Sequence, residues 1–222
     1  RSRCQRRDRC VRGCSFGAYY CSLSGSLAVA EQTGNLTIRA NSIVTEIVYD
    51  RAERKASGVR IKDAETGEEM EFLSRILFCN ASTVGTTAIL LNSRSETFPE
   101  GLGNSSGELG HNMMDHHYGM GAAGTLPGLT DTYYKGRKPV GFYIPRFRNI
   151  DDDTRRKDYV RGFGYQGGAQ RGRNVPDGAI GAELKETLFT PGEYQVRMTC
   201  FGELLPYHDN KMYLNFDKLD PN

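Results

Sequence analysis

The strongest constraint on the fold of this 222-residue chain is an alternation of apolar and polar side chains with a period of two. Ile43 and Ile47 alternate with polar neighbours before the turn RAERKASG, and Val59 and Ile61 do so after it. This period is typical of strands with one buried face. We therefore expect antiparallel strands over residues 42–50 and 57–63. Leu36 and Ile38 alternate in the same way and predict a further short strand over 36–39.

Two helices and one more strand are expected around this pair. Small residues and helical spacing predict a helix over 22–33, which Gly34 ends. The run ILFCN predicts a strand over 74–80 that is apolar enough to be buried on both faces, with Cys79 in the core. It leads into a helix with the sequence TTAILLNS, which Ser82 or Thr83 could cap. A buried strand that runs through a small-residue turn into a helix is typical of nucleotide pockets, although many such units bind no ligand.

The second half of the chain has a different composition. From Tyr118 onward glycines and aromatic residues dominate, and strands are expected in four runs: GRKPVGFYIPRF, YVRGFGYQGGAQ, EYQVRMTCFGELLP and KMYLNFD. A short helix is expected in AIGAELKETLF. The whole pattern predicts an α+β protein, in which an α/β portion with a β-meander precedes a mainly antiparallel β portion.

Charge excludes some classes of partner. The chain has 29 Lys and Arg against 27 Asp and Glu, a formal net charge of +2. Its basic start, RSRCQRRDRCVRGC, lacks the interleaved aromatic residues of a nucleic-acid surface. No apolar run approaches the roughly 20 residues that span a bilayer. We therefore expect neither a nucleic-acid partner nor a transmembrane segment.

The first cysteines have an unusual spacing. Cys4, Cys10 and Cys14 form the pattern C-x5-C-x3-C, and Cys21 follows. Zinc and iron–sulfur sites usually take four ligands, often in C-x2-C pairs, and such pairs are missing here. A metal site, a disulfide among these four residues and free thiols in a packed loop remain open alternatives, of which the residues favour free thiols.

Three of the four histidines lie in the run LGHNMMDHHYG, residues 109–119. The adjacent His116 and His117 point to opposite faces of an extended chain, and a site with two histidines and a carboxylate would also need Asp115. No G-x-S-x-G motif supplies a nucleophile. The residue types alone therefore favour a rigid loop, in which Asn112, Asp115 and His116 bond to the backbone.

A family resemblance adds to this interpretation. The runs GCSFGAYYCS, GNLTIRANSIVTEIVYD, ASGVRIKDAETGE, ILFCNASTVGTTAILLNS, GLGNSSGELGHNMMDHH and GELLPYHDNKMYLNFDKLD occur in this order. Together they resemble the glucose–methanol–choline oxidoreductases, and within them the bacterial sugar and gluconate dehydrogenase-like branch. The resemblance covers nearly the whole chain. Its most specific parts are N-S-S-G-x-x-G-x-N-x-M-D-H and G-E-x-L-P.

The resemblance implies FAD as cofactor, hydride transfer from a small alcohol or sugar hydroxyl to the flavin, and an electron-acceptor partner in the parent protein. It also implies roles for nine residues. Gly17 and Ala18 would lie along the flavin, and the backbone of Val44 would meet the adenine. The other residues lie in two places, the turn after the strand expected over 74–80 and the loop between the two domains: Asn80, Ala81, Ser82, Asn112, Asp115 and His116.

Two departures from the family pattern limit the implied activity. The G-x-G-x-x-G fingerprint after a first strand is missing, and no residue, His208 included, matches the catalytic histidine. We therefore assign no catalytic residue and expect an internal piece that holds FAD weakly and is inactive alone. Residues 1–110 would be part of the FAD-binding domain, and residues 111–222 the first part of the substrate-binding domain. A stand-alone β-rich carbohydrate-binding module and a metal-dependent hydrolase are the alternatives.

Overall fold

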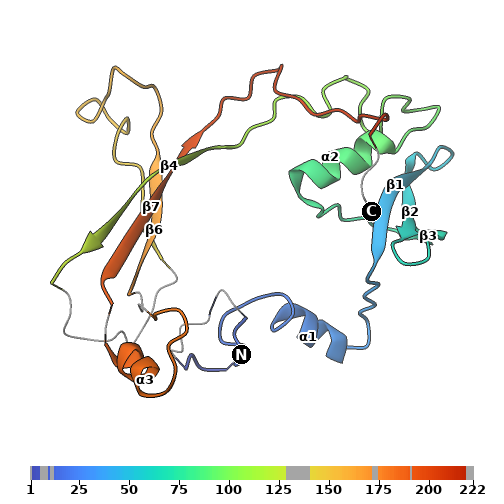
Figure 1. Ribbon diagram of the computed structural model, residues 1–222. Helices are drawn as coiled ribbons and strands as arrows, with labels where there is room; N and C mark the ends of the chain where they lie inside the picture. The colour runs from blue at the N-terminus through green and yellow to red at the C-terminus, as the bar shows by residue number, and fades with distance from the viewer. Residues whose placement is uncertain are drawn as a thin grey trace. The chain divides into compact units, whose positions relative to one another are not determined.

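A computed structural model describes residues 2–5, 10, 13–128, 141–171, 175–190 and 192–218, and Figure 1 shows their helices and strands. This part of the chain mixes helices with strands that all pair antiparallel, as the α+β class requires. In chain order the elements are α1 Ser26–Gln32, β1 Ser42–Asp50, β2 Lys55–Asp63, β3 Glu69–Leu73, α2 Ser82–Asn92, β4 His116–Leu126, β5 Phe142–Ile144, β6 Gly164–Arg171, α3 Gly181–Phe189 and β7 Tyr194–Glu203.

The chain forms two compact units. Arg1–Leu36 and Asp115–Leu204 form one unit, and Thr37–Met114 and Leu205–Asn222 form the other. We call them the four-strand unit and the three-strand unit, after their sheets. Within the described ranges, no helix has both the length and the apolar character needed to cross a membrane.

The sheet of the three-strand unit has the order β1-β2-β3, and it confirms the two strands predicted from the alternation. β1 keeps its predicted bounds, and β2 begins two residues earlier, at Lys55. Ile47 and Ile61 are buried on the face that packs against α2, where Leu91 is buried as well. The small core of this unit therefore lies between the sheet and one helix.

Two other strand predictions for this unit were wrong. Residues 36–39 and 74–80 form no strand and join no sheet in the structure. Arg39 instead forms an ion pair with Asp63, at 2.7 Å, and Asn41 turns the chain with a φ of 53°. Residues 74–80 have the composition of a buried strand. At Ser74 the N–H donates to the carbonyl of Ser57 in β2 at 2.9 Å, but residues 75–80 join neither sheet of the described structure. Without a ladder most of their side chains stay exposed, Cys79 among them, so Cys79 is not a core residue.

The helices differ from the predictions mainly at their starts. α1 is shorter than the predicted 22–33, because residues 22–25 form turns, while Gly34 follows its end with a φ of 70°, as predicted. α2 begins before the predicted TTAILLNS. Its N-cap is Ala81, and neither Ser82 nor Thr83 caps it with a side-chain hydrogen bond. Ser82 is instead the first residue of the helix, with a φ of 66°.

The sheet of the four-strand unit confirms the predicted antiparallel second half. Its order is β4-β7-β6-β5, and β4, β7 and β6 run side by side in Figure 1. The predicted helix near the end is α3. The run KMYLNFD, predicted as a strand, joins neither sheet of the described structure and ends in a turn over 216–217, so this prediction was wrong. The first part of GRKPVGFYIPRF lies outside the described residues.

Candidate functional site

The start of α2 forms an open hollow lined by polar side chains. Ser82, Thr83, Thr86 and Thr87 bring hydroxyl groups from two successive turns of the helix, because residues four apart share one helix face. Cys79 and Asn80 complete the wall from the segment that leads into the helix. The hollow therefore offers several hydrogen-bond donors and acceptors at a helix N-terminus.

The electrostatics of this end favour a ligand with negative charge. The first N–H groups of an α-helix have no acceptor within the helix, and their dipoles give the N-terminus a partial positive charge. In α2 no side chain of the described residues caps this end, and its first turn contains no acidic residue. Those N–H groups and the nearby hydroxyls suit a phosphate or another polar anion.

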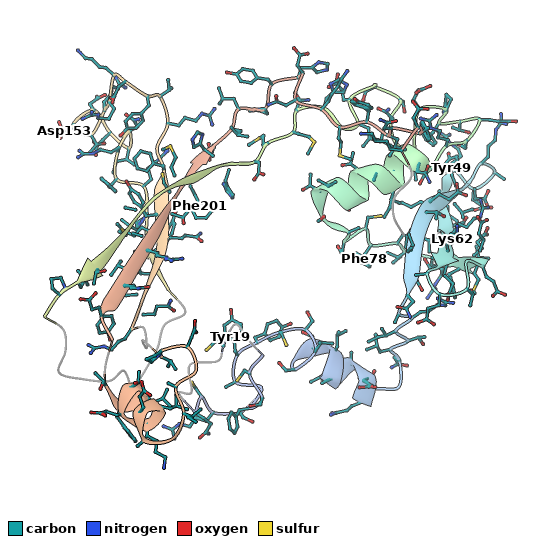
Figure 2. The ribbon with its side chains drawn as sticks, in the orientation of Figure 1. Tyr19, Tyr49, Lys62, Phe78, Asp153 and Phe201 are labelled. Carbon is teal, nitrogen blue, oxygen red and sulfur yellow. The ribbon has the colours of Figure 1, made fainter. Side chains whose placement is uncertain are left out.

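Exposed apolar side chains precede the hollow in the chain. Ile76 is 72% exposed and Phe78 is 82% exposed in the segment before α2, and Figure 2 shows Phe78 next to the start of the helix. A flat aromatic or other apolar group could pack against such side chains. The segment thus combines a helix end suited to an anion with exposed apolar side chains, the two features that a dinucleotide requires, and the residues present fit FAD.

The other end of α2 is fixed to β1 by two side chains. Ser93 Oγ accepts a hydrogen bond from the backbone N–H of Ile47 at 2.8 Å, and Ser93 is 4% exposed. Asn92 Nδ2 donates to the carbonyl of Thr45 at 2.7 Å. Thr45 lies at a register shift in the β1–β2 ladder, so its carbonyl is available to the helix. These bonds hold α2 at a defined position on the sheet.

Val44, the predicted adenine contact, belongs to the same unit. It lies in β1, pairs with Ile61 of β2 and is half-buried. The structure thus places Val44 on β1 and the predicted Ser82 on α2, two elements that pack together, with Ala81 as the N-cap of α2 and Asn80 just before it. Asn80, Ala81 and Ser82 are exposed.

Gly17 and Ala18 lie in the four-strand unit, in a turn after Cys14. The N–H of Gly17 donates to the carbonyl of Cys14 at 2.9 Å, and Gly17 has a φ of 60°. The backbone N–H groups of Tyr19, Phe16 and Ala18 point toward the Cys14 thiol and lower its pKa. Cys10, Cys14 and Cys21 are free thiols, so no disulfide joins these three. In this turn several backbone N–H groups therefore lie close to one thiol, that of Cys14.

Asn112 belongs to a clasp, which we define as residues 108–113 together with 205–212. Backbone bonds join its halves, from Met113 N–H to the carbonyl of Asn210 at 2.9 Å and from Met212 N–H to the carbonyl of Gly110 at 3.0 Å. Asn112 has a φ of 59°, and its amide lies 3.4 Å from Glu108 Oε2. A second segment almost one hundred residues away thus holds this loop, but the Asn112 amide meets the side chain of Glu108 instead of the predicted backbone group.

Two histidines stack within this clasp. The rings of His111 and His208 are stacked, with their centroids 4.0 Å apart, and His111 Nδ1 lies 2.8 Å from the carbonyl of His208. His208 Nε2 lies 3.3 Å from Glu108 Oε2. The two histidines thus hold the halves of the clasp together.

Asp115 and His116 begin the four-strand unit. Asp115 Oδ1 accepts the backbone N–H of His116 at 2.6 Å, and the Asp115 carbonyl accepts the N–H of Leu204 at 2.9 Å. The His116 ring meets the ring of Phe201 edge-on, at 5.5 Å. His116 and His117 are consecutive in β4 and pair with Glu203 and Gly202, so their side chains leave opposite faces. In the described part of the chain no three His, Cys, Asp or Glu side chains are grouped to hold a metal ion.

Comparison with known proteins identifies the family. The sequence profile of the GMC oxidoreductases matches residues 2–118, which is more than half of the chain. The chain therefore belongs to the GMC oxidoreductase family, as its motifs predicted.

Three curated relatives are similar over different lengths. The 2-methyl-1,2-propanediol dehydrogenase of Mycolicibacterium austroafricanum is 29% identical over 75% of this chain and 31% of its own length. The fructose dehydrogenase large subunit of Gluconobacter japonicus is 25% identical over 99% of this chain and 40% of its own length. The paromamine 6'-oxidase of Streptomyces fradiae is 30% identical over 51% of this chain and 21% of its own length. The chain thus spans less than half the length of each of these relatives.

Sequence reasoning missed several residues that shape the site. Thr86 and Thr87 line the hollow together with Ser82 and Thr83, and their spacing of four residues was a readable signal. The bond from Ile47 to Ser93 joins residues 46 positions apart, and nothing in the local pattern indicates it.

Proposed function

We propose that this chain contributes part of an FAD-dependent oxidoreductase that oxidises the hydroxyl of an alcohol or sugar. Membership of the GMC oxidoreductase family supports the class of reaction. The single observation that carries the assignment to this chain is the hollow at the start of α2, where hydroxyl groups surround an uncapped helix N-terminus. We further propose that residues 1–110 belong to the FAD-binding domain and residues 111–222 to the substrate-binding domain.

The residues of the three-strand unit would hold the nucleotide half of the cofactor. Asn80, Ala81 and Ser82 would bind along the dinucleotide at the start of α2, and the backbone of Val44 would face the adenine. The bonds of Asn92 and Ser93 to β1 would keep the helix and the strand at a fixed separation. When bound, FAD accepts the hydride of the substrate, so the work of these residues is to bind and orient.

The remaining residues would act near the flavin ring. Gly17 and Ala18 are small, and their turn would let the backbone approach the ring closely. Asn112, Asp115 and His116 would shape the passage from one domain to the other. We assign none of them a catalytic role, since each matches a position that shapes the cofactor pocket in the family.

The substrate class is proposed by analogy with the relatives. Two of them are named for the oxidation of a diol and of fructose, and a third for the oxidation of paromamine. A small alcohol or sugar with a free hydroxyl is therefore the proposed substrate, with a separate electron acceptor.

The test combines flavin retention with an activity assay. The purified chain is mixed with excess FAD, passed through a desalting column and examined for flavin absorbance, and sugar oxidation is then followed with an artificial acceptor. Because these 222 residues lack the glycine-rich fingerprint and a matched catalytic histidine, we expect weak retention and no turnover. FAD binding that is unchanged when Ser82, Thr83, Thr86 and Thr87 are all replaced would reject the proposed site. Stoichiometric metal with hydrolase activity would favour the hydrolase alternative.

A further inference from the structure

The two faces of the four-strand sheet differ in chemistry. Side chains directly opposite one another in an antiparallel ladder lie on the same face of the sheet. We define the apolar face by the side chains that share the side of Cys200 along β4 from Met120 onward and along the strands that pair beside it: Met120, Ala122, Leu126, Phe142, Ile144, Tyr165, Ala169, Arg171, Tyr194, Val196, Met198 and Cys200. Arg171 is the one charged side chain in this set, and Arg197 lies on the opposite face.

The guanidinium of Arg171 is buried without a hydrogen-bond acceptor. Its Nε, Nη1 and Nη2 atoms are all inaccessible to solvent, and none has a hydrogen-bond partner. The side chain lies over the ring of Tyr194, with Cζ 4.5 Å from the ring centroid. Its neighbours on the ladder, Ala169, Val196 and Tyr194, carry no carboxylate. A guanidinium removed from water needs acceptors for its N–H groups, and an unpaired one strongly destabilises the folded state.

The geometry points to a planar, singly charged acceptor. The Tyr194 ring lies against one face of the guanidinium, and the N–H donors along its edge still lack an acceptor. A carboxylate matches this edge with two parallel hydrogen bonds. We propose that Arg171, stacked on Tyr194, binds a carboxylate at the end of the apolar face, a site independent of the flavin contacts.

Two sources can supply this carboxylate. Arg171 ends β6 and Tyr194 begins β7, so the connection over 172–193 starts and finishes at the site. That connection carries Glu183 and Glu186 on α3, and Glu193 just before β7, and all three are exposed. A small carboxylate in solution, such as a sugar acid, is the other source.

The test compares melting temperatures in sodium acetate, sodium gluconate and sodium chloride at one ionic strength, with neutral glucose as an uncharged probe. A carboxylate from solution should raise the melting temperature of the wild-type chain by about 3–6 °C at ten times its Kd. The matched variant Arg197→Met removes a guanidinium from the other face and should keep this rise, whereas Arg171→Met should lose it.

A carboxylate from the chain itself gives a different result. In that case acetate leaves the wild type unchanged, the triple variant Glu183→Gln, Glu186→Gln and Glu193→Gln melts at a lower temperature, and acetate restores its stability unless Arg171 is also replaced. The proposal fails if neither acetate nor gluconate affects the wild type or the triple variant, or if Arg171→Met responds to them as the wild type does.

Discussion

Replacing Ser93 by alanine should weaken the attachment of α2 to β1. Ser93 Oγ accepts the N–H of Ile47 at 2.8 Å and donates to the carbonyl of Ile89 at 2.6 Å. The Ile89 carbonyl also accepts the backbone N–H of Ser93, at 2.9 Å, so it keeps a partner in the variant. The N–H of Ile47 loses its acceptor in a site that is 7% exposed. We therefore expect the variant to lose about 1–3 kcal/mol of unfolding free energy, the usual cost of a buried unpaired donor.

Urea denaturation measures the loss of unfolding free energy, and hydrogen exchange measures how often the amide of Ile47 becomes accessible. Ser105→Ala is the matched control, because Ser105 is exposed in the loop after α2 and should change the unfolding free energy by less than about 0.5 kcal/mol. In the Ser93 variant the amide of Ile47 should exchange faster than in the wild type. If the two alanine variants are equally stable and Ile47 exchanges at the wild-type rate, the hydrogen bond from Ile47 to Ser93 does not stabilise the fold and the reasoning is refuted.

Two further predictions concern the clasp and a turn. Gly110 has a φ of 92°, and a Cβ added there would lie 2.6 Å from a backbone carbonyl, whereas Gly103 has a φ of 78° and open space. Gly110→Ala should therefore speed hydrogen exchange in the clasp more than Gly103→Ala, and equal effects would contradict the contact. The N–H of Thr66, followed by the side chain of Arg39, lowers the pKa of Asp63 from 3.8 to about 2. Because a lowered carboxyl pKa stabilises the folded state above the unfolded value, this contribution should disappear as the pH falls from about 4 to 2, and Asp63→Asn should lack it. A carboxyl titration by NMR with a midpoint near 4 would disprove it.

The sequence predicted the elements whose pattern is local. The alternation around Ile47 and Ile61 defined β1 and β2, because one face of a two-layer unit must be buried and the period of two shows which face. The prediction of a strand over residues 74–80 was wrong because strand pairing is not a local property. Their composition indicates burial on both faces, but a strand also needs a neighbour, and pairing is a property of the whole chain rather than of a window.

In the candidate site, too, some features could be predicted from the sequence and others could not. Asn80 and Ser82, chosen from the resemblance, line the hollow at α2, whereas Thr86 and Thr87 were missed although their helical spacing could have indicated them. The Ile47–Ser93 bond, the stack of His111 on His208 and the buried guanidinium of Arg171 depend on tertiary contacts between segments far apart in the sequence. No local propensity indicates such contacts.

The most direct test of the central claim maps each half of the cofactor onto the chain by NMR. Backbone amide spectra of the labelled chain are recorded with ADP, with riboflavin and with FAD. We predict that ADP shifts the amides of Val44 and of residues 80–83, that riboflavin shifts those of Gly17 and Ala18, and that FAD shifts both sets. Shifts that are absent from residues 80–83 with ADP and FAD, or that riboflavin alone produces there, would contradict a nucleotide site at the start of α2.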